Sequence, residues 1–307
     1  MKLKRVVREV QPDVIHITVE PYAMMIPFLG KRIAGRTVLT IHGSYGIRPL
    51  ERPAQRAIAM RYYKQAVHFI AVSNYTKEAV IKELKRRKND AFAESFAQRT
   101  TVVHNGIPLP GKWEASLENK RKNILLVGGV KPRKGVLEAL DACALYKEKG
   151  GSPFVLSLIG TAEEDDYLSA VRAKIHDLKL QEEVQILGPV SQDKLESMYR
   201  TADLYLMPAL TIPNTFEGFG LVYLEANAYG VPCIGPNDSG AKEAIAEGRS
   251  GYCIDPKSPE QIAERMRWIL DEERIRRVNC RKWAEEHSIE KTVKEIESVY
   301  LMVQSAS

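Results

Sequence analysis

Two glutamates, Glu217 and Glu225, stand eight residues apart in a segment that glycines interrupt. From Leu221 onward the segment is apolar at most positions, which predicts a helix with little surface exposed to water. A carboxylate at position 225 of such a helix would lose its hydration, and burying an unpaired charge is very costly. Helical side chains lean toward the N-terminus, so we expect Glu225 to point back toward the loop that carries Glu217.

The start of the same helix predicts an anion site. Gly218 and Gly220 mark the preceding loop, and the N–H groups of residues 219–222 find no partner within a helix that begins there. Phosphate groups bind helix N-termini through such N–H groups. Two hydrogen-bond acceptors beside an anion site suit a ligand with both hydroxyls and phosphate, such as a nucleotide sugar. In the alternative interpretation Glu217 complements the helix dipole and Glu225 lies on a helix surface.

Length and composition indicate a soluble globular protein. The 307 residues are enough for two domains, each with its own core. Four cysteines without a CxxC spacing or nearby histidines fit a reduced, cytoplasmic protein better than a zinc site. No stretch approaches the roughly 20 apolar residues of a membrane span. The first residues lack the apolar core of a signal peptide.

Charge is distributed unevenly along the chain. Residues 1–120 hold 21 Lys and Arg against 10 Asp and Glu, a net charge of +11, whereas the remainder carries −5. The basic first part implies an anionic partner. Residues 77–88 fit either an amphipathic helix on anionic lipid or, as we favour, the solvated face of a helix whose Val80 and Leu84 face the core. Nucleic acid ranks last, because no aromatic stacking platform or helix-turn-helix pattern accompanies the charge.

Strand-like and helix-like stretches alternate along the whole chain. This alternation is typical of the α/β class with doubly wound parallel sheets, which bind ligands outside the carboxyl ends of their strands. The predicted strands are residues 13–18, 37–42, 67–72, 101–104, 123–128, 154–159, 184–187, 204–207, 231–234 and 251–254. The predicted helices include residues 135–149, 167–178, 191–201 and 259–270, with one more from about residue 288. A domain boundary is expected within residues 107–122, which are rich in proline and charge.

Taken in this order, the segments resemble the retaining glycosyltransferases of family four, within the glycosyl transferases group 1. That family has the GT-B architecture, in which two Rossmann-like domains face each other across a cleft. The resemblance rests on the glutamate pair and on residues 228–232, 238–243, 126–135, 190–195, 12–16, 40–43, 72–73 and 104–108. It implies an acceptor-side domain at residues 1–108 and a donor-binding domain at residues 109–307 that includes the final helix.

The resemblance also implies roles for single residues. Glu217 would bind a hydroxyl of the donor sugar, Glu225 the ribose hydroxyls, and Lys134 the diphosphate. His42 would contact the sugar near the reacting carbon, so the implied catalytic set is His42, Lys134 and Glu217. The turn at residues 188–190 would lie beside the nucleobase. The implied donor site adds Gly128, Gly129, Arg133, Gly188, Val190, Gly218, Phe219, Gly220 and Leu221.

The chain departs from the family pattern in two places. Gly129 stands where the family usually has an arginine, and Arg133 or Lys131 is the candidate for replacing that charge. The usual opening strand, glycine-rich loop and next units, roughly 60 residues, have no counterpart, so the first domain is expected to be truncated. Two interpretations stay open. One is an active retaining hexosyltransferase; the other is an inactive relative that binds a nucleotide or a partner chain.

The implied substrate is a nucleoside-diphosphate sugar, with no cofactor and no metal. Lys134 and the helix-start amides would stabilise the leaving diphosphate, and the chain has no Asp-x-Asp sequence. The acceptor is left open among polysaccharide, lipid-linked and small molecules. The resemblance implies a role in carbohydrate biosynthesis. The cysteine pattern and the lack of an apolar signal or membrane-spanning segment predict a cytoplasmic location, and the basic first part leaves peripheral contact at the inner face of the membrane open.

Overall fold

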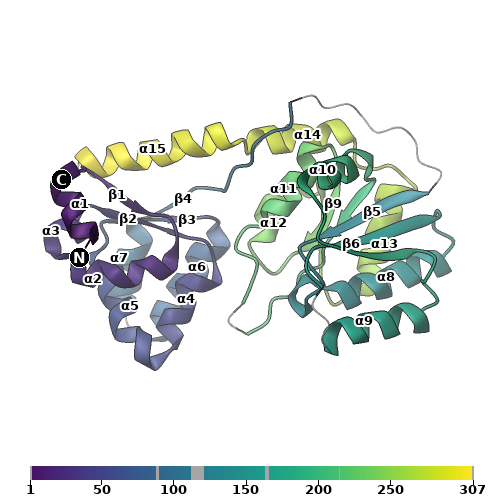
Figure 1. Ribbon diagram of the computed structural model, residues 1–307, viewed down its shortest axis with the longest axis horizontal. Helices are drawn as coiled ribbons and strands as arrows, with labels where there is room; N and C mark the ends of the chain where they lie inside the picture. The colour runs from purple at the N-terminus through teal and green to yellow at the C-terminus, as the bar shows by residue number, and fades with distance from the viewer. Residues whose placement is uncertain (1, 88–89, 112–120, 163–165, 214, 306–307) are drawn as a thin grey trace. The chain divides into compact units, whose positions relative to one another are not determined.

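In the computed structural model, the chain folds into two compact units (Figure 1). The structure describes residues 2–87, 90–111, 121–162, 166–213 and 215–305. Unit 1 consists of Met1–Gly106, Pro213–Phe219 and Ile289–Ser307, and unit 2 of Ile107–Ile212 and Gly220–Ser288. The segment Pro213–Phe219, which carries Glu217, therefore groups with unit 1 although its neighbours along the chain belong to unit 2.

Unit 1 is built on a parallel sheet. Strand β2 reads Thr-Val-Leu-Thr-Ile and is buried along its whole length, as expected for a strand covered on both faces. The strands pair in chain order: β1 (Ile15–Ile17), β2 (Thr37–Ile41), β3 (His68–Ala71) and β4 (Thr100–Val102). The helices are α1 (Lys2–Val10), η1 (Glu20–Met25), α2 (Ile26–Leu29), α3 (Lys31–Ala34), α4 (Ser44–Glu51), α5 (Pro53–Gln65), α6 (Asn74–Arg86), α7 (Asp90–Gln98) and α15 (Ile289–Ser305).

Apolar side chains cover both faces of this sheet. The larger cluster joins β2 and β3 to η1 and α4–α7. A smaller cluster on the other face joins Val38 and Ile70 of the sheet to Val299 and Val303 of α15. Alternate residues of a strand point to opposite faces, which is why neighbouring residues such as Val38 and Leu39 belong to different clusters. The last helix thus packs on unit 1, whereas the sequence analysis placed it with the second domain.

Unit 2 is built on a larger parallel sheet with helices on both faces (Figure 1). Its strand order is β10-β9-β8-β5-β6-β7. The strands are β5 (Lys122–Val127), β6 (Phe154–Ile159), β7 (Val184–Gly188), β8 (Leu204–Leu206), β9 (Cys233–Pro236) and β10 (Gly251–Ile254). The helices are η2 (Pro132–Lys134), α8 (Val136–Glu148), α9 (Asp166–Asp177), α10 (Gln192–Thr201), α11 (Leu221–Ala228), α12 (Ala241–Ala244), α13 (Pro259–Leu270) and α14 (Arg277–Glu286).

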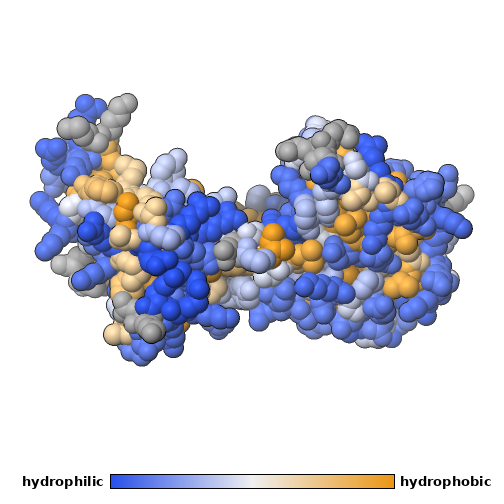
Figure 2. Space-filling model, turned by 90° about the horizontal axis from the view of Figure 1, so that it is seen from below, coloured by the Kyte–Doolittle hydropathy of each residue, from blue (hydrophilic) through white to orange (hydrophobic). Residues whose placement is uncertain are grey.

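The predicted α/β class with two parallel sheets is confirmed, and the first sheet is the smaller one. Each predicted strand overlaps a strand of the structure, and the predicted helices correspond to α8, α9, α10, α13 and α15. Of the predicted boundary region, residues 112–120 lie outside the described residues. Among the described residues, no helix combines the length and apolarity needed to cross a bilayer. Hydrophilic residues cover most of the face shown in Figure 2, with hydrophobic residues in small groups.

Candidate functional site

The strand order of unit 2 reverses beside β5. The chain runs from β5 outward to β7 and then returns to place β8 on the other side of β5. Doubly wound sheets bind ligands at such a reversal, outside the carboxyl ends of the two strands. Gly128 and Gly129 follow β5 at this point, and the chain that leads to α11 follows β8.

Gly128 makes room for the side chain of Lys134. Gly128 and Gly129 have φ angles of 130° and 87°, and both N–H groups donate to the Ile159 carbonyl at 3.0 Å. A Cβ atom on Gly128 would lie 2.9 Å from Cε and 3.1 Å from Nζ of Lys134. The ammonium of Lys134 therefore rests against bare backbone at the sheet edge where an anion is expected.

Helix η2, which carries Arg133 and Lys134, is tied to the chain that follows β8. The Arg133 carbonyl accepts a hydrogen bond from the Leu210 N–H at 2.9 Å. Gly135 has φ of 68°, and its backbone passes so close to the Pro208 carbonyl that no side chain would fit. These contacts hold the loops after β5 and β8 together.

Helix α11 is fixed on the sheet by buried polar contacts. Tyr223 Oη donates to the Met207 carbonyl at 2.7 Å, and Asn227 Nδ2 donates to the Ser250 carbonyl at 3.1 Å. Both side chains are fully buried. Because Tyr223 and Asn227 fix the rotation of α11, they also decide the direction of Glu225, which stands between them.

The start of α11 requires glycine. Gly220 caps the helix with φ of 87°, and a Cβ atom there would lie 2.7 Å from the Tyr223 ring. Leu221 is the first helical residue, and its side chain is 37% exposed. The first N–H groups of a helix have no partner inside it, so this end of α11 can accept an anion.

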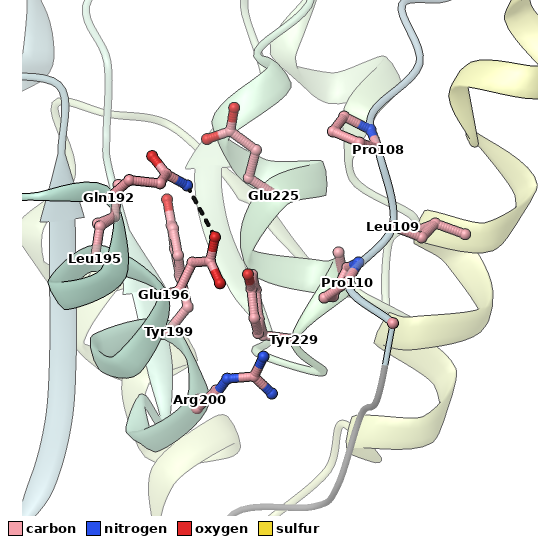
Figure 3. Close-up of a pocket in the computed structure, with 12 residues that line it drawn as sticks. Pro108, Leu109, Pro110, Gln192, Leu195, Glu196, Tyr199, Arg200, Glu225 and Tyr229 are labelled. Atoms are coloured by element: carbon pink, nitrogen blue, oxygen red, sulfur yellow. Dashed lines mark hydrogen bonds between the residues drawn. The ribbon is translucent and has the colours of Figure 1, made fainter.

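A pocket of about 390 Å³ lies beside Glu225 within unit 2 (Figure 3). Helices α10 and α11 and residues 108–111 form its walls. Of the described residues around this pocket, Glu225 alone belongs to the predicted donor set. The other lining residues are Pro108, Leu109, Pro110, Gly111, Gln192, Leu195, Glu196, Tyr199, Arg200, Ala228 and Tyr229.

Glu225 is a carboxylate in a partly dehydrated setting. Burial raises its pKa above the ordinary range, because the charged form is disfavoured away from water. Burial first, and then the charge of Glu225, also raises the pKa of Tyr199. Among the described residues no lysine or arginine forms an ion pair with Glu225. Such a group favours a ligand that donates hydrogen bonds, as ribose hydroxyls do.

Aromatic rings form one wall of the same pocket. The rings of Tyr199 and Tyr229 stack at a centroid distance of 5.5 Å with an interplanar angle of 8°. The guanidinium carbon of Arg200 lies 5.3 Å from the Tyr229 ring centroid. The sequence analysis gave neither tyrosine a role in binding.

The turn predicted to lie beside the nucleobase joins β7 to α10. Gly188 ends β7 with φ of 66°, and its carbonyl accepts a hydrogen bond from the Gly160 N–H at 2.9 Å. Val190 is half-buried and precedes Ser191, whose Oγ caps α10. The turn therefore leads directly into a helix that lines the Glu225 pocket.

In unit 1, the segment Pro213–Phe219 is held by the loop that follows β2. A Cβ atom on Gly43 would lie 3.1 Å from Gly218 Cα, and one on Gly218 would collide with the His42 carbonyl. The two backbones approach each other so closely that glycine is required at both positions. The structure therefore brings His42 and Gly218, both predicted site residues, into contact.

Hydroxyl groups complete the anchoring of this segment. Ser73 Oγ donates to the Gly218 carbonyl at 2.6 Å, and Thr76 Oγ1 donates to it at 3.2 Å. Ser44 Oγ accepts from the Phe216 N–H at 2.9 Å. The sequence analysis assigned no role to these hydroxyls; their position just after β2 and β3, at the carboxyl ends of the strands, was the signal available.

Two aromatic contacts flank Glu217. The Phe216 ring meets the Tyr75 ring at a centroid distance of 5.0 Å, and the Phe219 ring stacks on His104 at 5.2 Å. Glu217, two residues before Phe219, is half-buried.

The predicted site residues thus fall into two groups. Unit 1 holds His42, Glu217, Gly218 and Phe219, and unit 2 holds the others. The convergence of Glu217 and Glu225 on one ligand stays a prediction. The unit 2 group is Gly128, Gly129, Arg133, Lys134, Gly188, Val190, Gly220, Leu221 and Glu225.

Comparison with known families covers both parts of the chain. Residues 112–287 match the model of the glycosyl transferases group 1, and residues 1–109 match that of glycosyltransferase family 4. The chain belongs to the group 1, family 4 glycosyltransferases. The group 1 match contains every unit 2 residue of the candidate site.

Curated glycosyltransferases share up to about a third of the residues in the aligned part. The chain is 32% identical over 227 residues to a D-inositol 3-phosphate glycosyltransferase of Corynebacterium urealyticum, covering 67% of this chain and 52% of that one. It is 30% identical over 154 residues to a GDP-mannose-dependent α-(1-6)-phosphatidylinositol monomannoside mannosyltransferase of Mycobacterium tuberculosis, covering 49% and 39%. The matched part of the chain spans about half the length of the curated relatives.

Solved glycosyltransferases show the same fold. A glycosyltransferase from Rickettsia africae superposes with a TM-score of 0.77 at 18% identity, covering 99% of this chain and 80% of that one. HepE of Anabaena, solved in complex with UDP-glucose, gives a TM-score of 0.73 at 20% identity, covering 97% and 81%. The likeness extends over both units and supports the GT-B assignment.

Proposed function

We propose that this chain transfers a hexosyl group from a nucleoside-diphosphate sugar to an acceptor hydroxyl, with retention of the anomeric configuration. The main support is the family match, combined with the position of Lys134 Nζ against the Gly128 backbone at the topological reversal of unit 2. The ammonium of Lys134 and the N-terminus of α11 are groups that bind phosphate, so they suit the diphosphate of the donor. Glu225, partly dehydrated beside a pocket, suits the ribose hydroxyls of the same ligand.

In the proposed reaction, the bond between sugar C1 and the phosphate oxygen breaks, and its electron pair stays on the diphosphate. The acceptor oxygen bonds to C1 on the same face, and its proton passes to a phosphate oxygen. Lys134 and the first N–H groups of α11 stabilise the developing charge, which is usually the largest catalytic contribution. This chemistry needs no nucleophile from the protein, so Glu217 is assigned to holding the sugar and His42 to contact near C1.

The acceptor is proposed to be anionic, on the strength of the net charge of +11 in residues 1–120. Two relatives are named for D-inositol 3-phosphate and for a phosphatidylinositol monomannoside, both of which carry phosphate. Polysaccharide, lipid-linked and small-molecule acceptors all include anionic members.

The proposal is tested by donor turnover with water as the acceptor. GDP-mannose, the donor in the name of one relative, and UDP-glucose, the molecule in complex with HepE, are incubated with the protein, and released sugar is followed by proton NMR. We expect nucleoside diphosphate release together with a sugar whose first-formed anomer matches that of the donor. Inversion at C1, or the absence of turnover with every donor tried in an extended panel, would contradict the proposal.

A matched pair of glycine variants locates the diphosphate site. Gly128→Ala pushes Lys134 away and should lower kcat by about 100-fold, the loss typical of a misplaced charge-stabilising group. Gly150→Ala is the control: Gly150 also has a positive φ, of 76°, but a Cβ atom there meets nothing within 4 Å. Both variants carry backbone strain, so equal kcat values in the two would place the diphosphate elsewhere.

A further inference from the structure

His42 is hydrogen-bonded at two points to the segment that leads from β1 into η1. Its backbone N–H donates to Glu20 Oε1 at 2.6 Å. Its ring Nε2 lies 2.7 Å from the Thr18 carbonyl oxygen. The main chain and the imidazole of His42 are therefore both tied to the same three-residue stretch, residues 18–20.

The bond to the Thr18 carbonyl determines which nitrogen of the His42 imidazole carries the proton. A carbonyl oxygen only accepts hydrogen bonds, so Nε2 of His42 must carry the proton. In the neutral ring Nδ1 then holds the lone pair. His42 has an exposed side chain at the carboxyl end of β2, so Nδ1 is the nitrogen available to accept a hydrogen bond from a sugar hydroxyl.

Glu20, which accepts the hydrogen bond from the His42 backbone N–H, is a buried carboxylate. Its side chain is 4% exposed, and charged groups are rarely buried unless they are bonded. Helix η1, which begins at Glu20, packs against α5 and β2, so this residue lies beside the core of unit 1. Burial chiefly, together with the charge of Glu20, also raises the pKa of Tyr62 on α5. The oxygen that accepts from His42 is thus enclosed by the packing of unit 1.

We propose that Glu20 is a positioning residue for His42: it fixes the end of β2 and the Thr18 carbonyl, so that His42 presents Nδ1 as an acceptor to the donor sugar. This inference rests on the proposed function. The sequence analysis gave Glu20 no role, because nothing in the local pattern marks a residue 22 positions before its partner.

The first test measures the tautomer of His42 directly and does not require turnover of a substrate. Long-range proton–nitrogen NMR correlation distinguishes the two neutral tautomers of a histidine, and comparison with His42→Asn assigns the signal. We expect the Nε2–H form in the wild-type protein and in Glu20→Gln, whose amide oxygen still accepts from the His42 N–H. Glu20→Ala should give a mixture of tautomers, because the turn that holds the Thr18 carbonyl is released.

The second test uses turnover. Glu20→Ala should lower kcat by about 10- to 100-fold, the loss expected for a group displaced by less than about 1 Å, with KM changed less than threefold or so. Glu20→Gln should restore kcat to within about threefold of the wild-type value. The matched control is Glu83→Ala, because Glu83 of α6 is another buried glutamate of unit 1, 6% exposed and paired with Arg86 and with Arg87, which follows the helix.

The outcomes separate the two proposals. A folded Glu20→Ala protein with the wild-type tautomer and kcat would overturn the role of Glu20. Equal losses of kcat in Glu20→Ala and Glu83→Ala, with the tautomer unchanged, would also overturn it, since they would reflect stability alone. An absence of turnover in the wild-type protein would count against the proposed function, while the NMR comparison would still decide whether Glu20 holds His42.

Discussion

At the scale of single residues, the partial burial of Glu225 on α11 destabilises the folded protein when its carboxyl group is ionised. Its pKa is raised by burial, so folding disfavours the charged form of this carboxyl group relative to the unfolded chain. A carboxyl group with a raised pKa stabilises the folded state fully below its unfolded pKa of about 4.3. That contribution is lost as the pH rises through the higher folded value.

Glu225→Gln should therefore raise the melting temperature at pH 7, by an amount that shrinks to nothing near pH 4. The amide keeps the shape of the side chain and removes the charge. The same substitution should weaken nucleotide binding, because an amide is a poorer acceptor for two ribose hydroxyls than a carboxylate. Thermal unfolding at the two pH values checks the first part, with Glu182→Gln, an exposed site in unit 2, as the control. A lower melting temperature at pH 7 would contradict this account.

Residue types and spacing predicted part of the site. The partial burial of Glu225 followed from the apolar residues around it, and the glycines after β5 and before α11 marked the close backbone approaches. No pattern in the sequence assigned a role to Glu20 or Ser73, and the cause is physical. Their partners, His42 and Gly218, are 22 and 145 positions away, and such contacts arise only from tertiary packing.

At the scale of elements, helix α6 supports the segment that carries Glu217 and turns its apolar side chains to the core. Val80 and Leu84 are buried, as the sequence predicts. Lys77 Nζ donates to the Thr100 carbonyl at 2.8 Å, and Arg87 pairs with the buried Glu83. These contacts favour the solvated helix face over a lipid-binding one. Residue 88 lies outside the described residues, and membrane contact stays a prediction.

The N-cap of α6 offers a test of the anchoring. Ser73→Ala removes the cap and the 2.6 Å bond to the Gly218 carbonyl, and should cost about 2 kcal/mol of unfolding free energy. Ser258→Ala removes a cap of the same kind from α13 without a second buried partner, and should cost about 1 kcal/mol. Urea denaturation measures both. Equal losses would mean that the Gly218 bond does not stabilise unit 1.

The sequence predicted where helices and strands occur better than it predicted which of them pack against each other. Residues 37–41 and 154–159 are rich in apolar and β-branched side chains and contain no charged residue, which indicates buried parallel strands from sequence alone. The packing of α15 on unit 1 was not foreseen. Its apolar positions, such as Val299 and Val303, indicate a buried face but not which sheet covers it.

At the scale of the whole molecule, the proposed function gives the two parts different tasks, and their net charges differ accordingly. The chain beyond residue 120 carries a net charge of −5, so a diphosphate there depends on local groups such as Lys134 and the start of α11. The basic first part suits an anionic acceptor instead. Both family matches place the two parts of the chain in glycosyltransferase families, and the structural likenesses show the same fold over both units.

Isothermal titration calorimetry with UDP, GDP and ADP tests the central claim most directly. We predict that one of the three binds to a single site per chain with a Kd in the micromolar range, about −8 kcal/mol. Glu225→Gln should weaken that binding by about tenfold or more, which corresponds to the loss of one charge-assisted hydrogen bond. Absence of binding by all three nucleotides, or equal affinity in the variant, would contradict the assignment of Glu225 and Lys134 to a nucleotide-sugar site.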